Sequence, residues 1–235
     1  MTLERVDVES CEDRLQIALH QGRYDFVLER IRPSEHLLEI GVGAGTFTNQ
    51  ILSKCQSYVG VEYDHATCLD ARRKTGDKAN IVEGDARRLD FANEQFSFVV
   101  CLEVLEHLGN FTAGVKEIHR CLKPTGIAVV SVPFRRIGGK SETNEHHPYE
   151  PGEKELVTAF TTLFNRVEIY YQYFQETFWL TLTRKLHIRR FAGTHRIYSD
   201  LSKGHPNAIS KLFIGTKPRG LKLGLLLVVR DKVNQ

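Results

Sequence analysis

The order of apolar and amphipathic segments predicts a doubly wound α/β fold in which seven strands form one sheet. Three observations support this prediction. Short apolar runs alternate with amphipathic stretches, which is the pattern of βαβ units and therefore of parallel strands. The first apolar run leads directly into a glycine-rich turn. The chain, residues 1–235, is 41% hydrophobic and 26% charged, which fits one decorated domain of ordinary globular composition.

The expected elements follow in order along the chain. Residues 1–34 carry a helical periodicity that Pro33 ends, so we expect an N-terminal helical cover over the domain. Residues 174–220 exceed an ordinary connection, so we expect a helical insert or lid between the last two strands. The expected strands are 36–40, 57–62, 80–83, 96–102, 127–132, 166–173 and 222–231, and the expected helices are 47–54, 66–74, 111–122 and 153–164.

Charge and cysteine content restrict the classes of function. The 32 basic and 29 acidic residues nearly balance, so nucleic-acid binding is disfavoured although it is not ruled out. The five cysteines form no CxxC pair, which argues against a disulfide framework or a thiolate zinc site. The longest apolar run, Leu223–Val229, is too short to span a bilayer, and Met1–Cys11 lack the apolar core of a secretory signal. We therefore expect a cytoplasmic protein without a membrane span, and no pattern indicates its oligomeric state.

The stretch LLEIGVGAGTFTNQIL, residues 37–52, takes an apolar strand into three glycines and then a helix. Glycines let the backbone turn tightly and let a ligand lie against it. A dinucleotide-binding fingerprint beginning at Gly41 and Gly43 would have its third glycine where this chain has Thr46. The carboxylate of Glu39 would repel a pyrophosphate but suits a ligand that carries ammonium and sulfonium charges. S-adenosylmethionine is such a ligand.

Residues at the ends of the next three strands complete the expected cofactor site. An acid after the second strand suits the two ribose hydroxyls. An acid and a backbone amide after the third strand suit the amino group and a ring nitrogen of adenine. In a parallel sheet these strand ends meet at one crevice. The residues are Glu62 and Tyr63 after the second strand, Asp85 and Ala86 after the third, and Cys101 and Leu102 at the end of the fourth.

Together, residues 35–133 resemble the class I S-adenosylmethionine-dependent methyltransferases, in particular a small-molecule, ubiquinone-pathway-like subgroup. The resemblance rests on E-x-G-x-G, an acid after the second strand, G-D-A after the third and V-L-E-H after the fourth. It implies a Rossmann-like, mostly parallel sheet whose last strand is antiparallel. It also implies S-adenosylmethionine as the cofactor, with its methionine end at Glu39, Gly41 and Gly43. By the same resemblance, Tyr24 either closes over that end or packs in the core.

A hydroxyl acceptor requires a base or a metal ion to lower its pKa, and polar residues after the fourth and fifth strands are candidates for both roles. Glu103, Glu106 and His107 share one face if a helical turn begins there. Carboxylate and imidazole ligands suit Mg²⁺, Mn²⁺ or Zn²⁺. His146 or His147 follows the fifth strand and would supply a further ligand at the same edge of the sheet.

The E-x-x-E-H pattern resembles that of ubiquinone-pathway O-methyltransferases and of small-RNA 3′-end 2′-O-methyltransferases, in which a later histidine completes a metal site. His147, in H-P-Y-E, matches that histidine best. A second interpretation makes Glu106 a turn cap and lets His107 pack near the cofactor. His147 and Tyr149 would then be a general base and a substrate wall, or parts of a polar surface loop. We expect His107 and His147 to lie near the acceptor.

Residues 177–199 contain no acid, four arginines and one lysine. Such a segment either recruits an anionic acceptor or forms a solvated helix face. The sequence favours an S-adenosylmethionine-dependent O-methyltransferase of a small molecule, such as a sugar or another biosynthetic intermediate. The alternatives are an RNA 3′-end 2′-O-methyltransferase, a non-catalytic adenosyl-binding partner subunit and, more remotely, a nicotinamide oxidoreductase.

Overall fold

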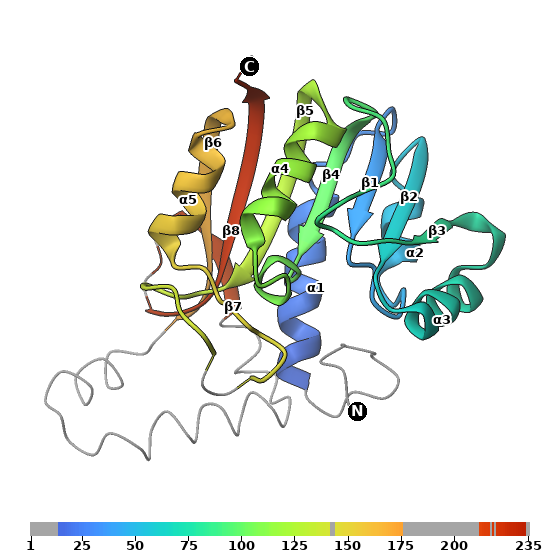
Figure 1. Cartoon of the computed structure of the whole chain (residues 1–235). Coiled ribbons are helices and arrows are strands. Elements are labelled where there is room, and N and C mark those ends of the chain that lie inside the picture. Colours follow the sequence, from blue (N-terminus) through green and yellow to red (C-terminus); the bar gives the residue numbers. More distant parts are fainter. Residues whose placement is uncertain (1–13, 142–143, 176–211, 217, 219, 234–235) are drawn as a thin grey trace, which may run out of the picture.

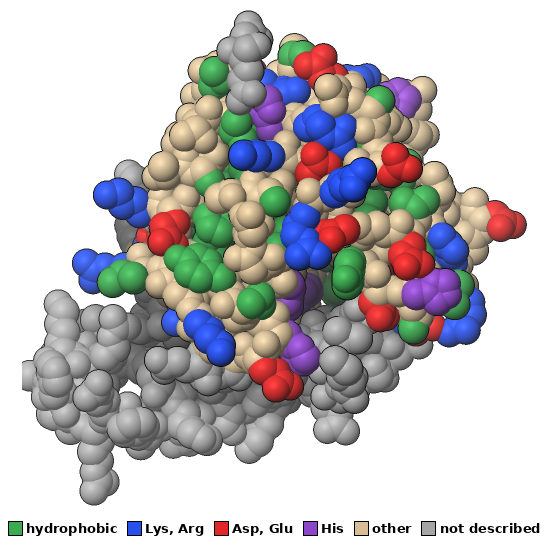
Figure 2. Space-filling model, in the orientation of Figure 1, with side chains coloured by type: hydrophobic (Ala, Val, Ile, Leu, Met, Phe, Trp, Pro, Cys, Tyr) green, Lys and Arg blue, Asp and Glu red, His purple; other side chains and the backbone are tan. Residues whose placement is uncertain are grey.

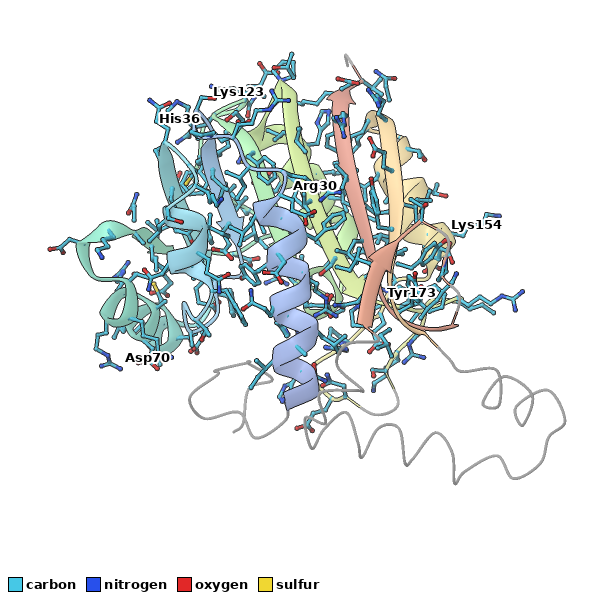
Figure 3. The ribbon with its side chains drawn as sticks, turned by 180° about the vertical axis from the view of Figure 1, so that it is seen from behind. Arg30, His36, Asp70, Lys123, Lys154 and Tyr173 are labelled. Atoms are coloured by element: carbon cyan, nitrogen blue, oxygen red, sulfur yellow. The ribbon has the colours of Figure 1, made fainter. Side chains whose placement is uncertain are left out.

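The computed structural model describes residues 14–141, 144–175, 212–216, 218 and 220–233. They form three layers, with one sheet between two layers of helices (Figure 1). Helices α4 (Phe111–Cys121) and α5 (Glu153–Thr161) cover one face of the sheet. Helix α1 (Arg14–Leu28) crosses the opposite face of the sheet. Figure 3 views the molecule from behind, so that α1 lies in front of the sheet. The sheet is therefore buried on both faces, as is usual for parallel sheets.

The strands lie in the order β3-β2-β1-β4-β5-β8-β6-β7. Strands β1 to β5 pair in parallel, whereas β8 is antiparallel to both of its neighbours, β5 and β6. The antiparallel last strand agrees with the family resemblance. The strand bounds are β1 His36–Ile40, β2 Ser57–Glu62, β3 Asn80–Glu83, β4 Phe96–Leu102, β5 Leu122–Pro133, β6 Phe164–Gln175, β7 Leu212–Gly215 and β8 Gly220–Lys232.

The doubly wound α/β class is confirmed, and each of the seven predicted strands is present. The structure adds an eighth strand, β7, which pairs antiparallel with β6 inside the segment expected to hold only a helical insert. Its four residues are too few to show a clear periodicity, so no sequence pattern predicted this strand. The rest of that insert, residues 176–211, lies outside the described residues, and so does the basic segment 177–199.

The remaining helices are short and connect the strands. Helix α2 (Thr48–Leu52) and helix α3 (His65–Thr75) follow β1 and β2, and the 3₁₀ helices η1 (Gly76–Lys78) and η2 (Leu105–His107) follow α3 and β4. The carboxylate of Asp64 caps α3 by accepting a hydrogen bond from the Thr67 amide at 3.0 Å. Helix α5 was predicted to extend to residue 164, but it ends at Thr161 and Phe164 begins β6.

Side chains of the central strands alternate between two hydrophobic clusters, one on each face of the sheet. In β4, Val99 and Cys101 pack with α4 and α5, whereas Phe98 and Val100 pack with α1, α2 and α3. All four are fully buried. This double burial explains why the strand reads as a continuous apolar run, and it fixes the strand ends on which the site is built.

The surface gives two further observations. No helix within the described ranges is long and apolar enough to cross a membrane. On the face drawn in Figure 2, acidic and basic side chains are interspersed, so no large area of one sign is seen among the described residues of that face.

Candidate functional site

A cavity of about 340 Å³ lies at the carboxyl ends of β1, β2 and β4. Open α/β sheets bind their ligands at this edge. The structure brings to this one cavity most of the site residues predicted from the sequence. Those that line it are Gly41, Gly43, Glu62, Tyr63, Asp85, Ala86, Leu102, Glu103 and His107.

The turn after β1 depends on glycine for two separate reasons. Gly41 has φ +79°, and a β carbon there would lie 2.3 Å from the Val104 side chain. Gly43 has φ +58°, but a β carbon there would meet no atom within 4 Å. Gly41 is therefore required by both backbone conformation and space, while Gly43 is required by conformation and leaves room for a ligand.

Glu62 ends β2 with its carboxylate held in one position. The residue is 6% exposed, yet it lines the cavity. One carboxylate oxygen accepts a hydrogen bond from the Gly43 amide at 2.9 Å, and the other accepts from the Asp64 amide at 3.1 Å. A carboxylate oxygen can accept more than one hydrogen bond, so these two backbone amides alone do not use the full acceptor capacity of Glu62.

Glu39 lies beneath the cavity and does not line it. The residue is 1% exposed, and its carboxylate accepts hydrogen bonds from the hydroxyls of Tyr24, at 2.6 Å, and Tyr58. Burial raises the pKa of Glu39, although these hydrogen bonds oppose the shift. Burial, followed by the Glu39 charge, raises the pKa of Tyr24 far above its ordinary value, so that hydroxyl stays protonated. Tyr24 itself lines the cavity, and its ring stacks on that of Phe47 with 4.6 Å between the ring centroids.

Asp85 follows β3 and is engaged by a neighbouring arginine. The Arg87 guanidinium donates to both Asp85 oxygens, at distances from 2.6 to 3.0 Å. These hydrogen bonds lower the pKa of Asp85, against a smaller effect of burial. Asp85 is therefore ionised and fixed, and a ligand amino group would share this carboxylate with Arg87.

The end of β4 separates two residues that were predicted to act together. Leu102 lines the cavity, whereas Cys101 is fully buried in the opposite hydrophobic cluster, because successive side chains of a strand point to opposite faces. Burial raises the pKa of the Cys101 thiol well above its usual range. Cys101 is accordingly a core residue that supports the strand end and does not border the cavity.

Glu103 departs from the helical turn that was expected to align it with Glu106 and His107. The 3₁₀ helix η2 begins only at Leu105, and Glu103 precedes it with φ +55°. A non-glycine residue in this left-handed region is uncommon and is often found at functional sites. The carboxylate of Glu103 therefore contacts residues on other elements, and it does not share one helical face with Glu106 and His107 as the spacing predicted.

The partners of Glu103 come from elements far apart in the sequence. One oxygen of Glu103 accepts from the Ser131 hydroxyl at 2.8 Å, and the other lies 3.1 Å from the Arg23 guanidinium. Arg23, on α1, is 3% exposed, and two of its guanidinium nitrogens have no hydrogen-bond partner among the described residues. A buried ion pair of this kind is costly to break, because the remaining charge would be left without compensation.

Glu106, His107 and His147 come together at the end of the cavity. One potential ligand atom from each lies within 4.8 Å of the others. Glu106 is 1% exposed, and neither of its carboxylate oxygens has a hydrogen-bond partner among the described residues. Burial, followed by the charge of Glu103, raises the pKa of Glu106 well above its ordinary value. His107 is exposed and lines the cavity, whereas His147 is buried behind it, with ring centroids 4.6 Å apart.

The two histidines are each held through Nδ1. His107 Nδ1 lies 3.0 Å from the carbonyl oxygen of His146, and His147 Nδ1 lies 2.6 Å from a carboxylate oxygen of Glu150. The second Glu150 oxygen accepts from Arg135 Nε. Burial opposes ionisation of Glu150, but hydrogen bonds led by those from His147 and Arg135 outweigh it and lower the pKa of Glu150.

Sequence reasoning did not assign roles to several residues of this site. Arg23 and Arg135 are charged side chains in ordinary polar surroundings, and only their distant partners show that they belong to the site. His20 and Phe47 line the cavity without any motif to mark them. One sequence feature could have indicated the partner of His147. Glu150, the acid of H-P-Y-E, stands three residues after this histidine.

Comparison with known proteins relates part of the chain to methyltransferases. A model of the "Methyltransferase domain" family matches residues 38–130, which include the glycine turn and the ends of the first four strands. A "probable S-adenosylmethionine-dependent methyltransferase" of Mycolicibacterium smegmatis is 28% identical over 171 residues, or 72% of this chain and 66% of that protein. The matched residues are therefore similar to a methyltransferase domain, and relatives of this chain are S-adenosylmethionine-dependent methyltransferases.

Two further comparisons define how far the likeness extends. The chain is 30% identical over 115 residues to a demethylmenaquinone methyltransferase of Beutenbergia cavernae, covering 46% of this chain and 48% of that protein. A solved S-adenosylmethionine-dependent methyltransferase of Thermotoga maritima shares its fold, with a TM-score of 0.63 and 16% identity over 93% of this chain and 91% of the other. The chain spans between 40% and 66% of the length of the first curated relatives, and these matches leave the acceptor open.

Proposed function

We propose that this methyltransferase transfers the methyl group of S-adenosylmethionine to a hydroxyl oxygen of a small-molecule acceptor. The observation that carries the proposal is the state of His107 at the cavity wall. Its Nδ1 faces the carbonyl oxygen of His146, which only accepts hydrogen bonds, so Nδ1 carries the ring proton and Nε2 carries the lone pair. An exposed imidazole in this state is the base that a hydroxyl acceptor requires.

In the proposed complex, the cofactor lies along the ends of β1 to β4. Its methionine end lies against Gly41, Gly43 and the ring of Tyr24, and Glu39 acts through the Tyr24 hydroxyl rather than by direct contact. Glu62, whose carboxylate faces the cavity, accepts from the ribose hydroxyls. The adenine lies at Asp85 and the neighbouring Ala86 amide, with Tyr63 and Leu102 beside it. This placement follows the residues that line the cavity.

The cofactor supplies, when bound, a methyl group on a positively charged sulfur that a nucleophile displaces directly. The tasks left to the protein are alignment, exclusion of water and removal of one proton. His107 Nε2 accepts the hydroxyl proton as the acceptor oxygen bonds to the methyl carbon. The products are the methyl ether and S-adenosylhomocysteine, and the exposed imidazole then releases its proton to solvent.

A second candidate adds a divalent cation, and the unpartnered oxygens of Glu106 favour it. A buried carboxylate without a hydrogen-bond donor is costly unless it is protonated or paired with a cation. Glu106, His107 and His147 offer the oxygen and nitrogen ligands that Mn²⁺ or Zn²⁺ accepts, so these residues fit such an ion. The cation would lower the pKa of the acceptor hydroxyl, and His107 would then hold the cation instead of accepting the proton.

Calorimetric titration with S-adenosylhomocysteine, with NAD as the control ligand, tests the cofactor assignment. We expect the chelated protein to bind S-adenosylhomocysteine and not NAD; the reverse result would contradict the proposal. Transfer of labelled methyl to a panel of hydroxylated small molecules, including anionic sugars, then tests the acceptor class. Turnover that survives exhaustive chelation would remove the cation and leave His107 as the base.

A matched pair of variants tests the role of His107. We expect His107→Gln to lower turnover by about 100-fold while S-adenosylhomocysteine affinity changes by less than about threefold. His65→Gln is the control, because His65 is also exposed and begins α3, outside the cavity lining. Equal losses of turnover and cofactor affinity in His107→Gln would place this side chain at the cofactor and contradict its role as base.

A further inference from the structure

The described residues between β5 and α5, 134–141 and 144–152, fold back on themselves and contribute His147 to its cluster with Glu106 and His107. Gly139 and Glu150 exchange two backbone hydrogen bonds, of 3.0 and 2.9 Å, across the base of the loop. The closure is tight, because a β carbon at Gly138 would lie 2.0 Å from a Glu155 carboxylate oxygen. This pairing fixes the backbone of Glu150 and therefore the direction from which its side chain enters the cluster.

Inside the closed loop, three side chains form a line. Arg135 Nε donates to one carboxylate oxygen of Glu150, and the other oxygen of Glu150 lies 2.6 Å from His147 Nδ1. The side chains of His147 and Glu150 are 7% and 8% exposed, whereas that of Arg135 is 35% exposed. The line therefore runs from a partly solvated cation through a buried carboxylate to a buried imidazole.

The chemistry of the line determines which ring nitrogen of His147 carries the proton. A carboxylate oxygen accepts hydrogen bonds and does not donate them, so Nδ1 must be the donor. The lone pair of a neutral ring then resides on Nε2, the nitrogen that Glu150 does not hold. The opposite tautomer would place a proton on Nε2, and that nitrogen would then be unable to hold a cation or accept a proton from Glu106 or a neighbouring group.

We infer that Glu150 and Arg135 are positioning residues that lock His147 in the tautomer whose lone pair lies on Nε2. This inference rests on the proposed function in one respect, because His147 matters to methyl transfer only if its Nε2 faces the reacting groups. Arg135 donates a hydrogen bond to one oxygen of Glu150. If Glu150 is replaced by glutamine, this donor holds the amide oxygen and leaves the amide nitrogen facing His147.

That geometry predicts an unusual effect of an almost isosteric change. In Glu150→Gln, the amide oxygen must still satisfy the Arg135 donor, so the amide NH₂ faces His147 Nδ1. Nδ1 then becomes the acceptor, and the proton moves to Nε2. We expect the ratio of the two His147 tautomers to invert, changing by about tenfold or more. In the double variant Arg135→Met/Glu150→Gln, the amide loses the Arg135 donor and keeps the Ser141 hydroxyl, which can donate or accept, so we expect the original tautomer to return in part.

Ring-nitrogen NMR of ¹⁵N-histidine-labelled protein measures the tautomer directly, and His147→Gln assigns the signals. The measurement uses chelated protein without cofactor or acceptor, so its result does not depend on whether the protein transfers a methyl group to oxygen. Glu145→Gln is the control: it makes the same change in the same loop, at a side chain that is 89% exposed. We expect Glu145→Gln and Arg135→Met alone to leave the tautomer unchanged.

The inference is overturned if His147 of the unsubstituted protein carries its proton mainly on Nε2, or if a folded Glu150→Gln keeps it on Nδ1. It is also overturned if the double variant shows the same tautomer ratio as Glu150→Gln. If Glu150→Gln fails to fold, the tautomer of the unsubstituted protein and its retention in Arg135→Met decide the question. A purely structural role of Glu150 would alter stability and would not exchange the two ring nitrogens.

Discussion

The cavity has two sides that are built in different ways. The cofactor side, formed by the ends of β1, β2 and β3, uses neighbouring segments: the Gly43 amide and the Glu62 carboxylate are 19 residues apart. The histidine side, formed by the ends of β4 and β5 and the loop 134–152, uses distant ones: His107 and the His146 carbonyl are 39 residues apart. The cofactor side therefore follows from local strand and turn chemistry, and the histidine side depends on how the whole chain folds.

The two sides also differ in how they treat charge. On the cofactor side, Glu62 receives two backbone hydrogen bonds and Asp85 is paired with Arg87. On the histidine side, the buried Glu106 carboxylate has no hydrogen-bond partner among the described residues. Carboxylates that already accept hydrogen bonds are typical of a preformed binding surface. A buried carboxylate without hydrogen bonds destabilises the fold until it binds a proton or a cation. In the proposed complex, cofactor binding and methyl transfer would therefore occupy opposite ends of one cavity.

The largest effect should come from the cofactor side, at Gly41. We expect Gly41→Ala to abolish S-adenosylhomocysteine binding and to lower the free energy of unfolding by roughly 3 kcal/mol or more, because it adds both a clash with Val104 and a strained φ. Gly43→Ala separates the two causes: it has the strained φ and no clash, so we expect a loss of about 1–2 kcal/mol. Calorimetry and chemical denaturation measure both, and equal losses would show that the clash is relieved.

The next effect concerns the ribose position at Glu62. We expect Glu62→Gln to weaken S-adenosylhomocysteine binding by about 10–100-fold, because a charged acceptor and the turn that it holds are both lost. Glu83→Gln makes the same change at the end of the neighbouring strand, on a side chain that is 53% exposed, and should leave affinity unchanged. Calorimetric titration compares them, and similar affinities for both variants would remove Glu62 from the cofactor site.

A smaller effect is expected at Glu106, and its sign depends on pH. The raised pKa means that the folded protein holds this proton at pH values where the unfolded chain, with a pKa near 4.5, has lost it. Stability is therefore lost as pH rises from about 4.5 through the folded pKa. We expect Glu106→Gln, in chelator at neutral pH, to raise the free energy of unfolding by roughly 1 kcal/mol, or about 2–4 °C in Tm.

Thermal unfolding across pH, with and without added Zn²⁺, measures the effect at Glu106. Glu103→Gln is the contrasting variant, because it removes the partner of the buried Arg23 and should lower stability. Added Zn²⁺ should stabilise the unsubstituted protein more than Glu106→Gln. If Glu106→Gln lowers Tm in chelator at every pH, the carboxylate is satisfied in solution and the contrast between the two sides fails.

The smallest effect should occur at Asp85. We expect Asp85→Asn to weaken S-adenosylhomocysteine binding by about fivefold, because the acceptor for the adenine amino group loses its charge and its Arg87 partner. The lowered pKa of Asp85 keeps it ionised at mildly acidic pH, so its contribution should be constant between pH 8 and about pH 5. Asp77→Asn, in η1, is the control. A loss of affinity that appears only above pH 7 would contradict this assignment.

The sequence predicted the fold class and most of the residues that line the cavity at the ends of β1 to β3, because these depend on local patterns. Strand, glycine turn and helix follow one another within residues 37–52, and the acids at positions 62 and 85 come directly after strands. Side-chain direction was harder to predict. Cys101 and Leu102 differ by one residue and point to opposite faces, and Glu39 is buried with its carboxylate bonded to the Tyr24 hydroxyl instead of lining the cavity.

The histidine side was predicted only in part, for physical reasons. The spacing of Glu103, Glu106 and His107 predicted a shared face, but a 3₁₀ helix begins at Leu105 and Glu103 turns away with a left-handed φ. The attraction of Glu103 to Arg23 competes with the helical arrangement, and that partner lies on another element. No local pattern reports such a pair.

The position of β8 has a consequence for how the protein is made. Strand β8 lies between β5 and β6, yet it is the last described strand to leave the ribosome. At a synthesis rate of about 5–20 residues per second, the apolar edge of β5 stays unpaired for several seconds. During that time the β6–β7 pair has no strand that connects it to the rest of the sheet. A nascent chain that stops before residue 220 therefore exposes two unpaired strand edges, so chaperones that bind such edges should associate with this chain until β8 inserts.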